Sequence, residues 1–383
     1  MKKNNPEIIP ASNHSVPLKV LIAPLDWGLG HTTRVIPVIH SFLTAGCQVL
    51  LAGNANQKML LQAEFPHLTF VDLEGYNVKY SQHHRLFMWK LLMQLPYLHS
   101  IIKKENNWLY KIVHEHNPQV IISDNRYGLY HPNVFSILIT HQLYIRSPFG
   151  KNINRLIQKM HNRFIEKFNA CWVPDQKENG LGGELSHPDI KPAIPVFYTG
   201  WLSRFKEDAT EKKEKHLLIL LSGPEPQRTI FEEKIFNEIK NLREQVIIVR
   251  GLPASKDKID MEPHAKVYNH LPANELNKLM LEASFIIGRC GYSTIMDLAR
   301  LKKKSILVPT PGQTEQEYLA GFLSAKKIIY SVDQHHFSLT KSMEQANLFN
   351  YTFPTENPGQ LEELIHSTIK NLTAQKQIET SPA

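Results

Sequence analysis

Short runs of apolar residues recur along the chain, and most are followed by a loop rich in glycine, proline or polar residues. This pattern is typical of buried strands in a parallel β-sheet, which helices cover on both faces. The runs lie at residues 18–23, 48–52, 119–123, 135–140, 171–173, 196–198, 216–221, 245–249, 266–268, 285–287 and 305–308. We predict a β-strand at each of these positions.

The stretches between several of these strands have the residue pattern of amphipathic helices. We expect helices at residues 34–45, 151–168, 229–242 and 358–374, the last packing back across the domains. Thr32 or Thr33 would cap the first of them, which places Pro37 near its first turn. Gly46 follows it and is the residue type favoured just past a helix end. The order strand, helix, strand predicts a parallel sheet with a right-handed crossover.

The chain divides into two series of strands, separated by the charged residues 205–215, which include few large apolar side chains. Such stretches are typical of linkers, and 383 residues exceed what one hydrophobic core usually supports. We therefore predict an α/β protein of two doubly wound, Rossmann-like domains. The predicted divisions are a disordered leader at 1–16, an N-terminal domain at 17–204, the linker at 205–215, a C-terminal domain at 216–350, and a C-terminal helix and tail at 351–383.

The composition is that of an ordinary globular protein, with 42% hydrophobic and 21% charged residues. A formal net charge of +8 favours an anionic partner, such as a nucleotide or a phospholipid surface. The only argument for nucleic-acid binding is the net charge, and no nucleic-acid-binding motif is recognised, so we expect no nucleic-acid partner. Cys47, Cys171 and Cys290 lack the spacing of a zinc site or a disulfide framework. Neither a signal peptide nor a membrane span is evident, so we expect a cytoplasmic protein.

Two glycine-bearing turns stand at matching places in the two series, each between a predicted strand and a predicted helix. The first is LDWGLGHT, with Gly28 and Gly30, and the second is SGPEPQRT, with Ser222, Gly223 and Arg228. Doubly wound sheets bind ligands at such turns, where glycine admits a ligand and free N–H groups attract anions. Neither turn matches the dinucleotide or ATP phosphate-loop motif. The alternative is that both are ordinary tight turns.

The densest group of candidate binding residues is the tract GRCGYSTIMD, which follows an apolar strand and opens a predicted helix. Its members of interest are Arg289, Gly291, Ser293, Thr294 and Asp297. Ser293 can cap the helix, and a carboxylate at Asp297 can accept hydrogen bonds from a ribose diol. Arg289 and the N–H groups of the turn suit a diphosphate. Alternatively, Asp297 only complements the helix dipole.

A second polar tract, VPTPGQTEQEY, follows the next predicted strand. Its prolines and glycine make the loop rigid, and polar residues then begin a helix. Gln313, Gln316 and Glu317 offer hydrogen-bond donors and acceptors of the kind that bind sugar hydroxyls. Placed directly after the first tract, they indicate a sugar next to a nucleotide.

The string GRCGYSTIMDLARLKKKSILVPTPGQTEQEYLA resembles the donor-binding signature of glycosyltransferase family 28. That family includes the N-acetylglucosaminyltransferase that completes lipid II in peptidoglycan synthesis. GLGHTTRVIP resembles its glycine-rich N-terminal loop, and the Tyr198-Thr199-Gly200 segment resembles the end of its N-terminal domain. The likeness covers about residues 18–350 in order, with close matching limited to these tracts. Together with APLDWGLGH, SDNRYGLY, THQ and SGPEPQR, they indicate a distinct, loosely characterised bacterial branch and not the lipid II enzyme itself.

The resemblance implies a GT-B fold, in which two Rossmann-like domains face each other across a cleft. Asp297 stands where the family usually has Glu for the ribose hydroxyls. Gln316 matches the first of two family glutamines that hold the donor sugar, and Glu317 replaces the second. Arg289 and the Ser222-Gly223 turn match positions near the diphosphate.

The resemblance further implies transfer of a hexose or N-acetylhexosamine from a nucleotide-diphosphate sugar, with UDP as the expected nucleotide. The acceptor would be a hydroxyl on a glycan or lipid-linked molecule. The tract SDNR is not the DxD motif that holds a metal in other glycosyltransferases, so we expect no metal and no other cofactor. Helix starts and arginines would stabilise the diphosphate instead. The alternatives are a nucleotide-sugar hydrolase or 2-epimerase, and a non-catalytic nucleotide-sugar-binding protein.

Transfer also needs a base near the acceptor hydroxyl. His31 is a candidate because it matches the family's loop histidine and its neutral form is available at about pH 7. Asp124 and His141 follow predicted strands of the N-terminal domain and face the same cleft, so either can be the base or bind acceptor. Asn125 and Arg126 are the candidate acceptor-binding residues. Alternatively, this Asp-Asn-Arg turn is a structural hydrogen-bond cluster.

Residues 83–104 (HHRLFMWKLLMQLPYLHSIIKK) are apolar and aromatic, with basic residues at both ends. Such a stretch can rest on an anionic membrane surface or hold a lipid-linked acceptor. The cytoplasmic protein would then be peripheral to the inner face of the plasma membrane. Pro96 interrupts the stretch, and a pair of core helices is the alternative.

Overall fold

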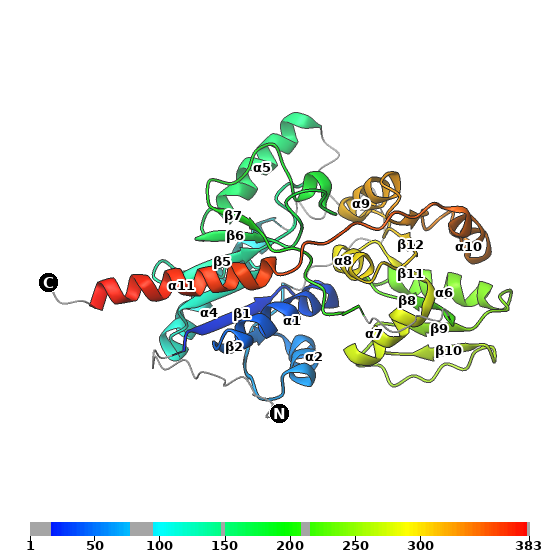
Figure 1. Ribbon diagram of the computed structural model, residues 1–383, viewed down its shortest axis with the longest axis horizontal. Helices are drawn as coiled ribbons and strands as arrows, with labels where there is room; N and C mark the ends of the chain where they lie inside the picture. Colours follow the sequence, from blue (N-terminus) through cyan, green and yellow to red (C-terminus); the bar gives the residue numbers. More distant parts are fainter. Residues whose placement is uncertain (1–16, 77–94, 147–149, 208–214, 381–383) are drawn as a thin grey trace, which may run out of the picture.

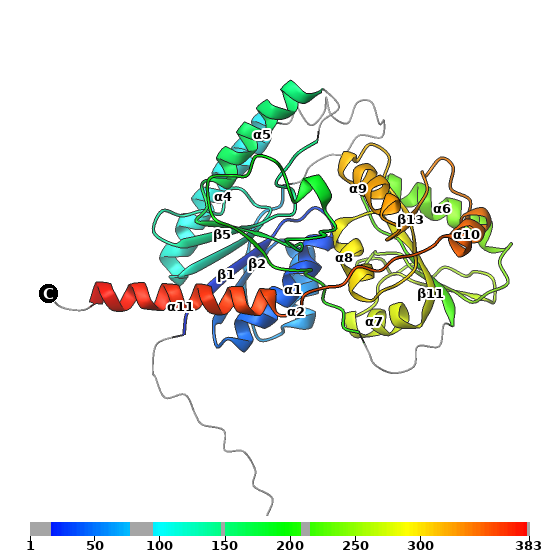
Figure 2. The ribbon, with the colours of Figure 1, turned by 45° about the horizontal axis from the view of Figure 1, so that its top comes forward.

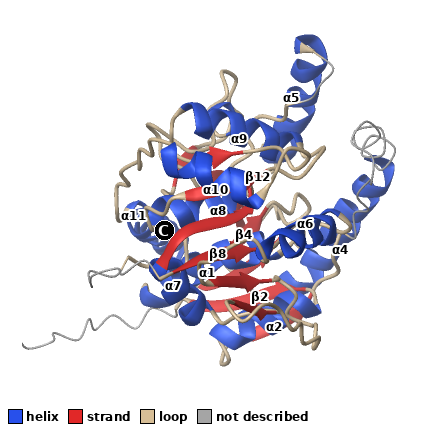
Figure 3. Cartoon of the chain, turned by 90° about the vertical axis from the view of Figure 1, so that its right-hand side faces the viewer, coloured by secondary structure: helices blue, strands red, loops and turns tan. Residues whose placement is uncertain are grey.

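A computed structural model of the chain describes residues 17–76, 95–146, 150–207 and 215–380. Within these ranges the chain forms two α/β halves, each built around one parallel sheet (Figures 1 and 3). The strand order is β3-β2-β1-β4-β5-β6-β7 in the N-terminal sheet and β10-β9-β8-β11-β12-β13 in the C-terminal sheet. The prediction of two doubly wound, parallel α/β domains is confirmed. The predicted leader and residues 208–214 of the predicted linker lie outside the described residues.

The N-terminal sheet contains β1 (Lys19–Pro24), β2 (Gln48–Gly53), β3 (Thr69–Asp72), β4 (Val120–Asp124), β5 (Phe135–Ile139), β6 (Ala170–Val173) and β7 (Val196–Tyr198). The C-terminal sheet contains β8 (His216–Leu220), β9 (Val246–Val249), β10 (Ala265–Tyr268), β11 (Ala283–Arg289), β12 (Ser305–Val308) and β13 (Tyr330–Ser331). Every predicted strand is present, with small differences at its ends. The strands β3 and β13 carry no sequence prediction because they are short and lack a continuous apolar run.

The helices are α1 (Leu29–Thr44), α2 (Ala55–Glu64), α4 (Leu95–His116), α5 (Lys151–Ile165), α6 (Gln227–Ile239), α7 (Ala273–Glu282), α8 (Tyr292–Arg300), α9 (Thr314–Ala325), α10 (Leu339–Leu348) and α11 (Gln360–Thr380). The helices predicted at residues 34–45, 151–168, 229–242 and 358–374 correspond to α1, α5, α6 and α11, and those predicted from the two polar tracts correspond to α8 and α9. In the part of the chain that the structure describes, no helix is both long enough and apolar enough to cross a membrane. Of the predicted membrane-facing stretch, residues 83–94 lie outside the described residues and 95–104 begin α4.

Helix α1 begins earlier than the sequence predicts. Its N-cap is Gly28, with a φ of 79°, and no side chain caps the helix. Thr33 lies inside it and donates its hydroxyl to Gly30 O at 3.1 Å. The predicted cap at Thr32 or Thr33 is therefore wrong, and Pro37 lies well inside the helix instead of in its first turn. The physical reason is that glycine, which adopts positive φ without strain, lets the chain turn into the helix sooner.

Helix α1 connects both halves of the molecule. Val35, Val38, Ile39 and Phe42 are buried at helical spacing, and α1 packs on β1 and β2. The helix also contacts α8 of the C-terminal half and the last helix, α11. Its predicted end is confirmed, since Gly46 has a φ of 80° and terminates the helix in the left-handed region.

Strand register brings the ends of three strands to one place. Pro24 of β1 pairs with Asp124 of β4, and Asp124 pairs with Ile139 of β5. Because the strands are parallel, the segments that follow them leave the same edge of the sheet. The start of α1, Asp124 and His141 therefore lie close together.

One of the apolar clusters in the core spans both halves. A single cluster of buried side chains includes residues of α1 and the N-terminal sheet, residues of α8 and β11, and Leu361 and Ile365 of α11. After α10 the chain runs back to the N-terminal half and forms α11 beside α1 (Figures 1 and 2). Ser41 of α1 donates to Glu362 of α11 at 3.3 Å. The last helix thus fastens the C-terminal half to the N-terminal one.

Candidate active site

Asp124 ends β4 at the joint between the two halves, and its side chain is fully buried. His31 Nδ1 lies 3.1 Å from Oδ2, and Arg34 Nε donates to Oδ1 and Oδ2 at 3.1 and 3.0 Å. His31 and Arg34 are three residues apart on α1, so both side chains reach the same carboxylate. Burial raises the pKa of a carboxyl, but the Arg34 charge and the His31 ring outweigh it and hold the pKa of Asp124 below its ordinary value.

The hydrogen bond to Asp124 assigns the tautomer of His31. A carboxylate only accepts, so Nδ1 carries the proton and Nε2 keeps its lone pair. Within the described part of the chain, Nε2 makes no hydrogen bond. Burial and the Arg34 charge lower the pKa of His31 more than Asp124 raises it. A neutral imidazole oriented by a carboxylate is the arrangement of a general base.

Arg34 also connects this group to the C-terminal half. Its Nη1 lies 3.2 Å from His141 Nδ1, and His141 Nε2 lies 2.7 Å from Glu315 Oε1 in the first turn of α9. Because Arg34 only donates, Nδ1 accepts and Nε2–H donates to Glu315. Gln142 also hydrogen-bonds this carboxylate, and the His141 ring stacks on Tyr292 with 4.1 Å between centroids. Burial raises the pKa of Glu315, but the His141 contact outweighs it and keeps the pKa low.

The structure thus joins the three predicted catalytic candidates, His31, Asp124 and His141, in one hydrogen-bonded group. Two further members, Arg34 and Glu315, carry no sequence prediction. Arg34 follows His31 by one helical turn, and that spacing was the available signal. Glu315 lies in the polar tract that begins α9, where nothing in the sequence separates it from its neighbours.

A second group of polar atoms surrounds the turn between β8 and α6. Gly223 has a φ of 101°, and a side-chain carbon there would lie 3.6 Å from Thr310 Oγ1 and 3.9 Å from Arg289 Nε. Both atoms are buried and make no hydrogen bond with the described residues. Arg289 Nη2 donates to Gln227 O at 2.6 Å, and the guanidinium lies over the Phe231 ring, 4.4 Å from its centroid.

The guanidinium of Arg289 therefore lacks a carboxylate partner among the described residues. Burial lowers its pKa to about 10, which leaves it charged at neutral pH. Burying a cation with an unpaired N–H costs free energy, because no protein group replaces the water that it loses. An anion beside Gly223 would complete the group. Ser222, next to this glycine, is exposed.

The starts of α1 and α8 meet at the joint. Ser293 Oγ donates to Gly30 O at 3.0 Å, and a side-chain carbon at Gly30 would lie 3.0 Å from that hydroxyl oxygen. Helix α8 has Gly291 as its N-cap and no side-chain cap. The predicted capping role of Ser293 is therefore wrong, because its hydroxyl bridges the two halves instead. Thr294 follows it in α8, and Gly28 precedes α1 on the opposite side.

The loop between β12 and α9 holds its polar side chains in a local network. Backbone N–H groups of the loop donate to Gln316 Oε1 and to Glu317 Oε1, both at 2.9 Å. Gln316 also hydrogen-bonds Gln313. The three predicted sugar-binding residues therefore lie around one turn, which adjoins Glu315. Their contact with a sugar stays a prediction.

Asp297 is engaged by the segment that joins the two halves. Ser203 Oγ donates to Asp297 Oδ1 at 2.6 Å. Burial raises the pKa of Asp297 to about 6, against the opposing effects of this hydrogen bond and of Arg204 and Arg300. The carboxyl group thus serves a contact within the protein, and its contact with a ribose stays a prediction.

Two predicted binding arginines hold parts of the protein together. Arg126 is buried and pairs with Glu105 of α4, with 2.5 Å between Nε and Oε1. Arg228 pairs with Glu225 in the β8–α6 turn. Asn125, which follows Asp124 with a φ of 58°, has a buried Oδ1 that makes no hydrogen bond with the described residues. Asn125 is therefore the better placed of the two predicted acceptor-binding residues.

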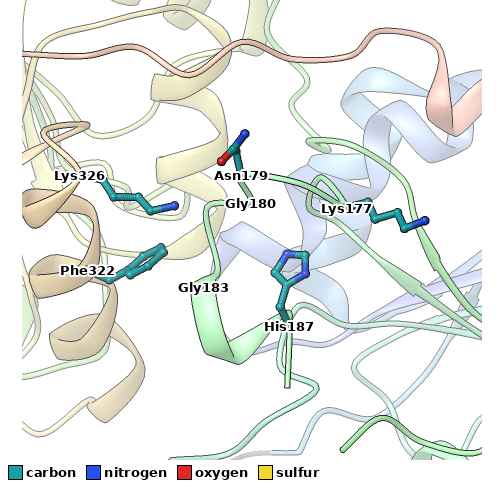
Figure 4. Close-up of a pocket in the computed structure, with 7 residues that line it drawn as sticks. All are labelled: Lys177, Asn179, Gly180, Gly183, His187, Phe322 and Lys326. Carbon is teal, nitrogen blue, oxygen red and sulfur yellow. The ribbon is translucent and has the colours of Figure 1, made fainter. Parts of the chain in front are cut away.

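A separate open cavity of about 190 Å³ lies between the loop after β6 and α9 (Figure 4). It is lined by Lys177, Asn179, Gly180, Gly183, His187, Phe322 and Lys326. No predicted catalytic or donor-binding residue is among them. The lysines come from opposite halves of the molecule, as Figure 4 shows, so the cavity also lies along the joint.

Comparison with known proteins agrees with this architecture. Residues 226–372 match the glycosyltransferase family 28 C-terminal domain, which confirms the resemblance predicted from the C-terminal tracts. The match contains Arg289, Thr310 and Glu315. A search of curated protein sequences finds no match.

Solved glycosyltransferase structures resemble the chain along nearly its whole length. The spinosyn forosaminyltransferase SpnP is 15% identical, with a TM-score of 0.58 and 96% of each chain covered. The glycosyltransferase SnogD from Streptomyces nogalater is 10% identical, with a TM-score of 0.60, covering 93% of this chain and all of its own. The spinosyn rhamnosyltransferase SpnG, solved with thymidine diphosphate, is 14% identical, with a TM-score of 0.58 and coverage of 93% and 96%. The chain therefore has the GT-B fold of these structures, and its C-terminal half is similar to the family 28 C-terminal domain over residues 226–372.

Proposed function

We propose that the protein is a glycosyltransferase that moves a sugar from a nucleoside-diphosphate donor to an acceptor hydroxyl. The observation that carries this proposal is the unpaired, buried Nε of Arg289, next to the unpaired Thr310 hydroxyl at the Gly223 turn. A diphosphate bound there would supply the missing anion, and glycine leaves room for its oxygens. The turn lies at the carboxyl ends of the strands, where ligands of doubly wound folds bind.

His31 is the proposed general base. The acceptor hydroxyl gives its proton to Nε2 while its oxygen forms a bond to the anomeric carbon of the sugar. The bond from that carbon to the diphosphate oxygen breaks, and the electron pair leaves with the diphosphate. Asp124 stabilises the imidazolium that forms, and Arg289 stabilises the charge that develops on the leaving group.

We propose that the transfer needs no metal ion. The leaving diphosphate requires positive charge, and the buried guanidinium of Arg289 provides it at the place where the diphosphate would bind. Across the described ranges, no three His, Cys, Asp or Glu side chains are grouped as metal ligands. Activity in the presence of a chelator is the corresponding test.

The donor sugar, a hexose or N-acetylhexosamine, is proposed to contact Gln313, Gln316 and Glu317. This turn adjoins Glu315, which reaches His141 of the N-terminal half, so a sugar held there is close to the proposed base group. Uridine diphosphate is the proposed nucleotide, from the resemblance to family 28. SpnG is solved with thymidine diphosphate, which makes that nucleotide the direct comparison.

The proposed acceptor hydroxyl belongs to a glycan or a lipid-linked molecule and meets the donor beside His31. Asn125 supports this placement, because its unpaired side-chain oxygen adjoins Asp124. SpnG is also solved with a spinosyn aglycone, so in that protein the same fold admits an acceptor of another class. Peripheral membrane contact through residues 83–104 stays part of the proposal.

The test is a nucleotide-release assay on the full chain with UDP- and TDP-sugars and a panel of glycan and lipid-linked acceptors. We expect release that depends on both donor and acceptor, and loss of about 100- to 10,000-fold in kcat for His31→Ala. His40→Ala, on the same helix but 58% exposed, is the matched control and should keep wild-type activity. Equal release without any acceptor, or full activity of His31→Ala, would contradict the proposal.

A further inference from the structure

The outer face of α5 carries a row of exposed apolar side chains. Ile153, Leu156 and Met160 are 44%, 60% and 46% exposed. Their spacing of three and four residues places them in one stripe along the helix. The other side of α5 is buried, with Ile165 fully and His161 nearly fully covered. Figures 1 and 2 show α5 along the outer edge of the N-terminal half, away from the C-terminal sheet.

Cations form a second row beside this stripe. Arg155, Lys159 and Arg163 repeat every four residues and are all exposed. No ion pair joins any of them to an acidic side chain of the described residues. Lys167 continues the row past the end of the helix and lies 4.9 Å from the centroid of the Tyr130 ring. The outer face of α5 therefore combines three apolar side chains with three positive charges, and Lys167 adds a fourth just past the end of the helix.

The size of the stripe and the charges beside it restrict what can cover this face. The stripe extends over eight residues, or about 10 Å of helix, which is small for a stable protein interface of about 800 Å² per partner. A two-fold pairing of α5 with a second copy would place the two rows of cations near each other, and they would repel. An anionic lipid surface suits both the apolar stripe and the cations beside it. Its phosphates neutralise the cations, and its acyl region receives the apolar side chains.

We propose that the outer face of α5 binds an anionic phospholipid surface. The position of α5 brings this contact close to the candidate active site. The helix follows the loop after His141 and Gln142, and Gln158 Nε2 donates to Leu143 O at 2.6 Å. A bilayer under α5 is therefore close to the acceptor side of the molecule. The contact is independent of the proposed reaction, and it lies outside residues 83–94.

The test is co-sedimentation of the full chain with vesicles of phosphatidylcholine, with and without phosphatidylglycerol. We expect binding to the phosphatidylglycerol vesicles, weakened by salt. Leu156→Glu should lower the partition coefficient by about tenfold or more, because it removes a large apolar side chain from the contact. The matched control is Leu348→Glu on α10, where the leucine is 81% exposed, and it should bind as the wild type does.

A second variant tests the charge row separately. Arg155→Gln, Lys159→Gln and Arg163→Gln together should weaken binding by about fivefold for each cation removed. Equal partition of the wild type into both kinds of vesicle would overturn the proposal, as would unchanged binding of Leu156→Glu. A dimer in solution that Leu156→Glu dissociates would also overturn it, by showing that this face is a protein interface.

Discussion

Asp124 keeps a negative charge away from water because Arg34 and His31 surround its carboxylate. The hydrogen bonds of the group have fixed directions. Arg34 donates to Asp124 and to His141, and His141 donates to Glu315. Since these donors and acceptors are all engaged, His31 Nε2 is the atom of the group that is left to take a proton.

Asp124→Asn tests whether the Asp124 carboxylate sets the tautomer of His31. The amide keeps the shape of the carboxylate but can present an N–H to His31, which favours the wrong tautomer. We expect kcat to fall by about 100- to 10,000-fold. Stabilisation by a bound nucleoside diphosphate should persist, because Arg289 is untouched, and this shows that the variant is folded. Near-wild-type kcat would contradict the assignment.

The pH dependence of kcat/KM tests the state of His31. Burial and the Arg34 charge lower its pKa below the ordinary value of 6.5, and only the neutral ring accepts a proton. The acidic decline of kcat/KM should therefore have its midpoint below pH 6.5. The measurement is a pH–rate profile of kcat/KM for the wild type, with the same profile for Glu315→Gln beside it. A midpoint above pH 6.5 would mean that another group controls the rate.

Among the elements, the turn between β8 and α6 is the one whose backbone matters most for a ligand. Gly223 has positive φ, which costs a residue with a side chain about 1 kcal/mol. An added methyl group would also occupy the space that Arg289 Nε and Thr310 Oγ1 face. The same position thus combines backbone strain with the proposed anion site.

Gly223→Ala should therefore lower the free energy of unfolding by about 1 kcal/mol and weaken nucleoside-diphosphate binding by about tenfold or more. Calorimetric titration and denaturant unfolding measure the two effects. Gly321→Ala is the matched control, because it lies inside α9 with nothing near its added carbon. It should raise stability by about 0.5 to 1 kcal/mol and leave binding unchanged. Wild-type affinity in Gly223→Ala would place the anion elsewhere.

Apolar runs predict the strands of both sheets because strands buried on two faces require continuous apolar residues. The same reasoning misses β3 (Thr69–Asp72), whose residues are only partly buried at the sheet edge. It also misplaces the start of α1. No capping residue marks Gly28, and the next glycine is held by Ser293 from the other half of the chain. That contact depends on tertiary packing, which no local pattern contains.

At the scale of the whole molecule, contacts across the joint position the candidate site. His141 and Glu315 are 174 residues apart, and Ser293 and Gly30 are 263 apart. The rule that ligand-binding residues follow parallel strands could predict that Asp124 and His141 lie close together. It could not predict the contribution of Glu315, which depends on how the two domains meet.

Glu315→Gln tests the bridge between the halves. The amide oxygen can still accept from His141, but the negative charge near Arg34 and His31 is lost. We expect kcat/KM for transfer to fall by about tenfold, the size of one weakened charge-assisted hydrogen bond. Binding of a nucleoside diphosphate without sugar should remain, because the Arg289 turn is intact. Loss of that binding would show that Glu315 supports the donor site itself.

Asp297→Asn tests the contact between α8 and the segment that joins the halves. Folding raises the pKa of Asp297 to about 6, so its ionised form costs stability as pH rises from about 4 through 6. The variant should match the wild type at about pH 4 and be more stable by about 1 to 2 kcal/mol at pH 7. Denaturant unfolding at both pH values measures the difference. An equal difference at both would rule out titration of Asp297 as the cause.

The central claim is that the Arg289 turn binds the diphosphate of a nucleotide donor without a metal. A thermal-shift titration of the full chain with uridine and thymidine diphosphates, in the presence of EDTA, tests it most directly. One of them should stabilise the wild type, by about 2.7 kcal/mol at 100 times its dissociation constant, and should stabilise Arg289→Lys far less. No shift with either nucleotide, or a shift that appears only after a divalent metal is added, would contradict the claim.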